Sequence, residues 1–188
     1  SVAMHAVRRE LLLAQAQAVG LPLTTLPLPY PCSNEEYEVR MRGCLREVVA
    51  RGITHVAFGD LYLQSVREYR EDKLRGTGLE PLFPLWGRPT AQLAQEMLAA
   101  GARAVLTCVD PRVLPSHFVG RTWDAALLAA LPPNVDPCGE NGEFHTFACA
   151  GPAFHHPVAV TVTERVERDG FWFADLVPED GPALPQSA

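Results

Sequence analysis

The sequence predicts an α/β fold in which helices cover a mainly parallel sheet. Helical and strand-like segments alternate along most of the chain, which is the pattern of repeated strand–helix units. The run 53–60 is short, apolar and rich in β-formers, as buried strands are. Residues 156–177 differ, because polar and apolar residues alternate there around Asp169 and Gly170. That pattern predicts a small C-terminal β-hairpin region.

The N-terminal half contains two helices with clear boundaries. Apolar residues recur at helical spacing over 3–19, and Gly20 ends that helix. Ser33 is placed to cap the next helix, which runs to about Arg51. The two acids that follow Ser33 suit the positive end of a helix.

The same signals define the remaining elements. Thr90 is expected to cap a helix that Gly101 ends, and Pro132 ends a helix that begins at residue 122. The other expected elements are an extended segment with edge-strand prolines at 21–29, a helix at 64–75, an extended segment at 80–86 and a strand at 103–110.

Composition excludes several classes of function. The 188 residues fit one domain or one domain with a small appendage, and the net charge of −6 predicts no nucleic-acid partner. No apolar run approaches the roughly 20 residues that span a bilayer, so no membrane association is expected. The five cysteines form no C-x-x-C pair, which favours a reducing, cytoplasmic setting. A single lysine among 16 basic residues suggests a GC-rich, bacterial genome.

The stretch "FGDLYLQSVREYREDKL" (58–74) is one candidate for binding chemistry. Gly59 allows a tight turn and close approach of a ligand at a strand end, where Asp60 could accept from a ribose hydroxyl or hold a cation. Arg67 and Arg70 share a helix face and suit phosphate or carboxylate recognition. The alternative is that Asp60 caps the helix and the charges form surface pairs.

The stretch "DPCGENGEFHTFACAGP" (136–152) is the second candidate. Cys138, Glu140, Glu143 and His145 could all ligate a metal, but their spacing is typical of no structural zinc site, and no metal site is predicted. Nucleophilic catalysis by Cys138 would need a base and a third group, which the sequence does not indicate.

A carboxylate pair is the interpretation that we favour for this stretch. Glu140 and Glu143 flank a flexible turn that begins at Asn141, and such carboxylates can position an amine or polarise a nucleophile. His145 and Thr146 follow on an expected strand and could converge on the same pocket. A polar turn before a strand remains the alternative. Common nucleotide motifs are absent, since the sequence contains neither a Walker-type G-K-S/T nor a G-x-G-x-x-G.

Three segments in order, "FGDLYLQSVREYREDKLRGTGLEPLFPLWGRPTAQLAQEMLAAGARAVLTCVD", "FVGRTWD" and "DPCGENGEFHTFACAGPAF", resemble the diphthine–ammonia ligase family. This family belongs to the N-type ATP pyrophosphatases of the adenine nucleotide alpha hydrolase, or PP-loop, superfamily. The resemblance extends from about Val2 to Val160. It implies a Rossmann-like (HUP-type) three-layer fold with a five-stranded parallel core.

The resemblance also implies a reaction. Such enzymes use ATP, with Mg²⁺, to convert a carboxylate into an acyl-adenylate, and ammonia then yields the amide and AMP. In the best-known members the acceptor carboxylate belongs to diphthine on elongation factor 2. Because bacteria are not expected to make diphthamide, we expect another carboxylate acceptor here, on a protein or free. The alternatives are an ATP- or AMP-binding module without ligation and a non-catalytic partner subunit. A homo-oligomer is compatible with the ligase and with the binding module, and it would count against the partner subunit.

By position, the resemblance places Gly59, Asp60 and His5 at the nucleotide. It places near the acceptor pocket the catalytic candidates Glu140, Asn141, Glu143, His145 and Thr146. Trp86, Arg88 and Arg121 match family positions of less defined role, where Trp86 could fill a gap at the sheet edge and Arg121 could pair with Asp124.

One family feature is missing from the sequence. Family members begin with a strand and a Ser-Gly-Gly-x-Asp-Ser loop that holds the ATP phosphates, so we expect an N-terminal βα(β) unit to precede Ser1. The expected organisation is an N-terminally incomplete nucleotide-binding domain at 1–135, a signature loop and β region at 136–177, and a flexible tail at 178–188.

Overall fold

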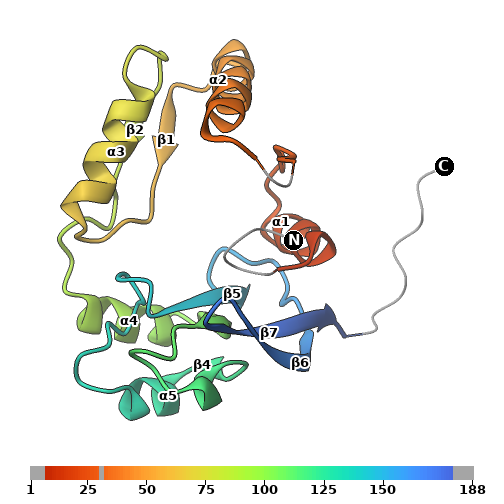
Figure 1. The fold of residues 1–188 in the computed structure, drawn as a ribbon, viewed down its shortest axis with the longest axis vertical. Helices are drawn as coiled ribbons and strands as arrows, with labels where there is room; N and C mark the ends of the chain where they lie inside the picture. The colour runs from red at the N-terminus through yellow and green to blue at the C-terminus, as the bar shows by residue number, and fades with distance from the viewer. Residues whose placement is uncertain (1–6, 30–31, 180–188) are drawn as a thin grey trace. The chain divides into compact units, whose positions relative to one another are not determined.

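The computed structural model describes residues 7–29 and 32–179, and it confirms the α/β class (Figure 1). Contacts divide the chain into two compact units. We call residues 24–88 the βαβ unit, and residues 1–23 together with 89–188 the sheet unit. The functional boundary expected after residue 135 stays a prediction. No helix within the described ranges is long and apolar enough to cross a bilayer.

The βαβ unit contains the parallel strands that the sequence predicts. Strands β1 (His55–Ala57) and β2 (Glu80–Leu82) pair in parallel, joined by helix α3 (Gln64–Leu74). Parallel neighbours need such a crossover connection. Helix α2 (Asn34–Ala50) precedes β1. The predicted cap of α2 is confirmed, because the Ser33 hydroxyl accepts from the backbone N–H of Glu36 at 3.1 Å.

The sheet unit is built around strand β3 (Arg103–Val109), which pairs antiparallel with three strands. Two of these share one edge of β3, because β4 lies opposite its first half and β7 opposite its last two residues. Strand β5 takes the other edge, and β6 pairs with β7. The bounds of these strands are β4 Thr122–Trp123, β5 Phe144–Ala150, β6 Val160–Arg168 and β7 Phe171–Pro178.

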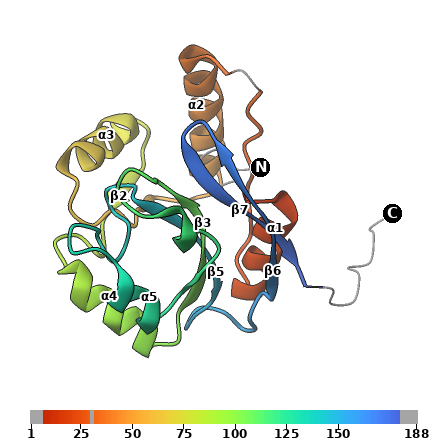
Figure 2. The same ribbon diagram turned by 60° about the horizontal axis from the view of Figure 1, so that its bottom comes forward.

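Helices cover both faces of this sheet (Figure 2). One face packs against α4 (Thr90–Ala99), the short 3₁₀ helix η1 (Ser116–Phe118) and α5 (Ala125–Ala130). The other face packs against α1 (Arg9–Val19), whose Leu11 is fully buried. The sheet unit therefore has three layers, with the sheet in the middle.

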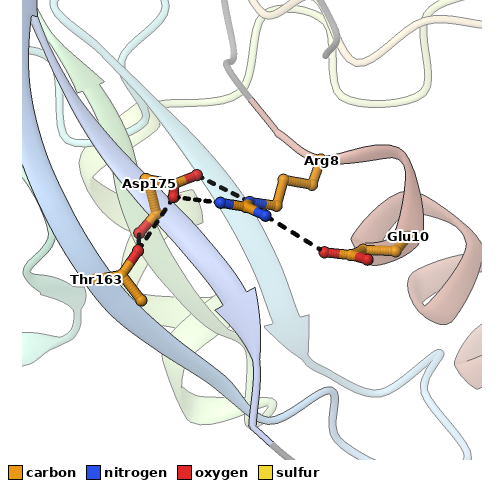
Figure 3. Close-up of polar contacts among 4 residues, drawn as sticks. All are labelled: Arg8, Glu10, Thr163 and Asp175. Atoms are coloured by element: carbon orange, nitrogen blue, oxygen red, sulfur yellow. Dashed lines mark hydrogen bonds and ion pairs between the residues drawn. The ribbon is translucent and has the colours of Figure 1, made fainter. Parts of the chain in front are cut away.

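An ion pair joins α1 to the sheet (Figure 3). The Arg8 guanidinium, at the start of α1, donates to both carboxylate oxygens of Asp175 in β7, at 3.0 and 2.6 Å. Thr163 in β6 donates its hydroxyl to Asp175 as well, at 3.1 Å. Glu10 lies 3.9 Å from Arg8 on the other side. Asp175 thus links a helix and two strands, and the Arg8 hydrogen bonds hold its pKa below the ordinary aspartate value.

The predicted hairpin is confirmed. Strands β6 and β7 pair antiparallel around Asp169 and Gly170, whose φ values are 51° and 80°. Two consecutive positive φ values are what a two-residue type I′ hairpin turn requires. Asp169 tolerates this conformation better than most side chains do, and glycine has no side chain to clash.

Several predicted details are wrong. The larger sheet is antiparallel rather than parallel, because all the pairings of β3 are antiparallel. The helix predicted from 122 begins at Ala125, since Thr122 and Trp123 pair with β3 and Asp124 caps the helix. The cap of α4 is Pro89, without a side-chain hydrogen bond, and Thr90 is its first residue. Residues 21–29 form no strand. Pro178, where the flexible tail was predicted to begin, is instead the last residue of β7, and residues 180–188 of that tail lie outside the described residues.

Candidate functional site

A buried carboxylate organises the loop that precedes β5. Glu143 is only 5% exposed, and its Oε1 accepts from the backbone N–H of Asp136 at 3.0 Å and from the Asn141 side-chain amide at 2.8 Å. Its Oε2 accepts from the backbone N–H of Asn141 at 3.0 Å. A buried carboxylate is stable when it accepts hydrogen bonds in this way. The geometry therefore gives Glu143 a role in holding the loop.

The loop also depends on a glycine and an indole. Gly139 has a φ of 71°, and a Cβ on it would lie 2.8 Å from the Phe144 carbonyl oxygen. Both the conformation and the close backbone approach therefore require glycine. The Trp123 indole N–H donates to the Pro137 carbonyl at 2.9 Å, which ties the loop to β4.

A second buried acid, Asp110 at the end of β3, contacts the Glu143 backbone. The backbone N–H of Asp110 donates to the Glu143 carbonyl at 2.9 Å. The Asp110 side chain accepts from Arg112 Nε at 2.8 Å and from Nη2 at 2.6 Å, and these bonds hold the pKa of Asp110 below its usual range. The sequence predicts the end of this strand but not the pairing of Asp110 with Arg112. The sequence signal for this pairing is an aspartate at the end of an apolar run, followed two residues later by an arginine.

His145 and Thr146 do not face the same way. Both lie in β5, opposite Cys108 and Leu106 of β3. Successive residues of a strand point to opposite faces of the sheet. One of the two side chains therefore lies on the face covered by α4 and α5, and the other on the face covered by α1. Only one of them can share a pocket with a group on a given face, and the role of each stays a prediction.

Cys138 is a poor nucleophile in this setting. Burial, followed by the charges of Asp136 and Glu140, raises the pKa of the Cys138 thiol to about 11. Its Sγ donates to the Thr90 carbonyl at 3.5 Å. The thiol is therefore neutral at physiological pH, whereas the thiolate is the reactive form.

The metal hypothesis gains no support from the geometry. The part of the chain that the structure describes contains no group of three or more histidine, cysteine, aspartate or glutamate side chains placed to hold a metal ion. Both oxygens of Glu143, one of the four potential ligands, already accept hydrogen bonds from the loop.

The residues predicted to meet the nucleotide follow β1. The Asp60 side chain is 16% exposed and accepts from Arg70 Nε at 3.4 Å. The alternative that Asp60 caps α3 is wrong, because α3 begins after Leu63 without a side-chain cap. The alternative of surface charge pairs is confirmed for Arg67, which donates to Glu71 at 2.8 Å. His5 lies outside the described residues.

Gly59 occupies an open position. A Cβ on Gly59 would meet no atom within 4 Å, and Gly59 is not among the glycines with positive φ. Neither backbone conformation nor packing within the βαβ unit therefore requires a glycine here.

The three residues of less defined role fall into two places. Trp86 lies edge-on to Phe83, with ring centroids 5.9 Å apart, and Arg88 lies in the connection between β2 and α4. The predicted pairing of Arg121 with Asp124 is wrong. Arg121 lies over the Phe118 ring, 4.8 Å from its centroid, while Asp124 accepts from the backbone N–H of Leu127 and caps α5.

The structure thus sorts the predicted residues into two sets. Glu140, Asn141 and Glu143 lie together in one loop of the sheet unit, immediately before the strand that carries His145 and Thr146. Gly59 and Asp60 lie together at a strand end of the βαβ unit.

Comparison with known proteins relates the chain to one group of ligases. It is 26% identical over 176 residues to the diphthine–ammonia ligase of Bos taurus, an alignment that covers 86% of this chain and 66% of the bovine protein. It is 30% identical over 129 residues to that of Mus musculus, covering 66% of this chain and 48% of the mouse protein. It is 33% identical over 103 residues to that of Danio rerio, covering 52% and 40%. No protein-family model matches the sequence.

These identities are weak to moderate, and they support a relationship to the diphthine–ammonia ligases. The chain spans about half to two thirds of the length of the mammalian relatives.

Proposed function

We propose that this chain is part of an ATP-dependent ligase that joins ammonia to a carboxylate. The observation that carries the proposal is the similarity to the bovine diphthine–ammonia ligase, which extends over 86% of this chain. The name of that relative states a ligation of diphthine with ammonia. Membership of the N-type ATP pyrophosphatases, with a Rossmann-like nucleotide-binding domain, is part of the same proposal.

The proposed reaction has two steps. In the first, an oxygen of the acceptor carboxylate attacks the α-phosphorus of ATP, and the bond from that phosphorus to pyrophosphate breaks. In the second, the nitrogen of ammonia bonds to the acyl carbon, the bond from that carbon to the AMP oxygen breaks, and the nitrogen loses a proton to a base. The products are the amide, AMP and pyrophosphate.

We assign the nucleotide to the end of β1. Ligands of parallel sheets bind beyond the carboxyl ends of the strands, which is where Gly59 and Asp60 lie. Asp60 would accept from a ribose hydroxyl, with Arg70 holding its carboxylate in place. His5 is proposed to contribute as well. Mg²⁺ would neutralise the phosphate charge. Proteins bind Mg²⁺ through one or two carboxylates together with substrate phosphates, and Asp60 could supply such a carboxylate.

We assign the amine and the acceptor to the loop before β5. Glu143 holds the loop closed through its bonds with Asn141. Glu140 would accept the proton that the ammonia nitrogen loses, and Asn141 would help to position the ammonia. His145 or Thr146 would contribute from the adjoining strand. The acceptor is a carboxylate, on a protein or free.

Exchange of radiolabelled pyrophosphate into ATP tests this proposal in the native protein. Labelled pyrophosphate enters ATP only when an acyl-adenylate has formed and then reverts. Exchange should therefore require an added carboxylate acceptor. Asp60→Asn should lower exchange by about tenfold or more, since a hydrogen bond to a charged group contributes about 1.5–3 kcal/mol. Glu140→Gln should spare exchange and lower amide formation. Glu164→Gln, an exposed change on β6 that removes the same charge, is the matched control.

The same assay separates the alternatives. Thermal stabilisation by ATP without exchange would favour a nucleotide-binding module that does not ligate. A chain that neither binds ATP nor supports exchange, but forms a stable complex with a phosphate-loop protein, would favour a non-catalytic partner subunit. The cytoplasmic setting, bacterial origin and homo-oligomeric state stay predictions.

A further inference from the structure

Two arginines lie over aromatic rings at the carboxyl ends of β1 and β2. The guanidinium carbon of Arg67 lies 4.7 Å from the ring centroid of Phe83 and 4.8 Å from that of Trp86. The guanidinium carbon of Arg70 lies 5.0 Å from the centroid of Phe58. Phe58 and Phe83 are themselves stacked, with centroids 5.5 Å apart. The two cations therefore stand over neighbouring rings of one aromatic stack.

Each guanidinium is held along one edge only. Arg67 donates from Nε to Glu71 at 2.8 Å, and Arg70 donates from Nε to Asp60 at 3.4 Å. Within residues 7–29 and 32–179, the terminal nitrogens of Arg67 and Arg70 have no hydrogen-bond acceptor. The side chains are 33% and 40% exposed. Both side chains are therefore partly exposed, and their terminal nitrogens are available to bond an added anion.

This arrangement prepares the arginines for an anion. Cation–π contacts and the bonds at Nε fix each planar group, so less side-chain entropy is lost on binding. Arg67 and Arg70 are three residues apart in α3, which places them on one helix face. The two terminal nitrogens of each guanidinium form a fork that can bind two oxygens of an anion. A carboxylate has only two oxygens and would fill one fork, so two forks on one helix face suit an anion with more oxygens.

We propose that Arg67 and Arg70 form a binding site for a phosphate-type oxyanion. Glu71 and Asp60 accept hydrogen bonds from the Nε atoms of the two arginines and neutralise part of their charge. The anion would therefore be recognised by hydrogen bonds from the terminal nitrogens rather than by net positive charge. The inference rests on the geometry of the βαβ unit alone. It fails or succeeds independently of the ligase reaction, although pyrophosphate, a product of that reaction, is the natural probe.

Titration of the native chain with inorganic pyrophosphate, at constant ionic strength and without ATP or acceptor, tests the site. The Trp86 indole N–H resonance, assigned with a Trp86→Phe variant, should shift in a saturable way, because Arg67 lies over that ring. Isothermal titration should give a Kd that Arg67→Gln and Arg70→Gln each weaken by about tenfold or more. Arg67→Lys keeps the charge but loses the planar fork, and it should weaken binding as well.

Arg75→Gln is the matched control. Arg75 follows α3, is 79% exposed and pairs with Asp72, so the substitution removes the same charge beside the same helix. Its Kd should stay within about twofold of the native value. The proposal is overturned if the native chain shows no saturable binding, if Arg75→Gln weakens binding as much as Arg67→Gln, or if Arg67→Lys binds as the native chain does.

Discussion

Asn141 donates twice to Glu143, from its backbone N–H at 3.0 Å and from its side-chain amide at 2.8 Å. These two bonds close a ring across Gly142 and leave the carboxylate facing into the loop. Two residues that the sequence suggested as parts of a reactive cluster are thus bound to each other. The division of roles follows from this contact: Glu143 supports the loop, and Glu140 is the carboxylate to test for chemistry.

Replacing the supporting carboxylate should weaken the fold. Glu143→Gln puts an amide NH₂ on a buried side chain whose two oxygens accept from three N–H groups, so at least one of these donors loses its acceptor. We expect the free energy of unfolding of the native chain to fall by about 1–3 kcal/mol, measured by urea denaturation. Glu164→Gln removes the same charge from an exposed site and should change it by less than about 0.5 kcal/mol. Equal effects would show that Glu143 has no supporting role.

Two glycines of the same loop should differ in their tolerance of alanine. Gly142 has a φ of 82°, but a Cβ there would meet no atom within 4 Å. Gly142→Ala should therefore cost only the conformational strain, about 1–2 kcal/mol. Gly139→Ala should destabilise the chain further, because its Cβ would lie 2.8 Å from the Phe144 carbonyl oxygen. Thermal unfolding of the two variants measures the difference, and an equal loss would refute the steric contribution.

The Arg8–Asp175 pair should make stability depend on pH. Hydrogen bonds from Arg8 lower the pKa of Asp175 in the folded chain. The contribution is therefore complete above the unfolded pKa, about 3.9, and is lost as the pH falls through the lower folded value. Asp175→Asn should be less stable than the native chain at pH 7, and the gap should shrink below about pH 4. Urea denaturation at several pH values measures this gap.

Glu10→Gln provides the control for that pH dependence. Glu10 also faces Arg8, but at 3.9 Å and with a side chain that is 57% exposed. Its removal should leave both the stability at pH 7 and the acid dependence close to those of the native chain. A gap between the native chain and Asp175→Asn that stayed constant from pH 7 to pH 3 would contradict the assigned pairing.

Local signals in the sequence predicted local structure well. The Ser33 cap of α2, the end of α1 at Gly20 and the turn at Asp169 and Gly170 each depend on residues within a few positions of one another. Such preferences act through backbone conformation and one or two hydrogen bonds, so a short window of sequence contains them.

Pairings between distant segments could not be predicted in this way. The order of strands around β3 depends on which strands pair with its two edges, and the alternation of helices and strands does not determine strand direction. The candidate site shows the same limit. Sequence spacing placed Glu143 beside Asn141, but only the fold shows that Asp110 reaches the Glu143 backbone and that Arg67 lies over Phe83 and Trp86.

Alkylation of Cys138 should be slow in the folded chain at neutral pH. Burial raises the pKa of this thiol to about 11, so about one molecule in 10⁴ carries the thiolate at pH 7, and the rate should rise about tenfold per pH unit toward pH 10. In urea the pKa should return to about 8.5 and the thiol should react quickly. Iodoacetamide labelling followed by peptide mass spectrometry measures both rates. Cys138→Ser should retain pyrophosphate exchange, whereas fast native labelling at pH 7 with loss of exchange in Cys138→Ser would restore the nucleophile hypothesis.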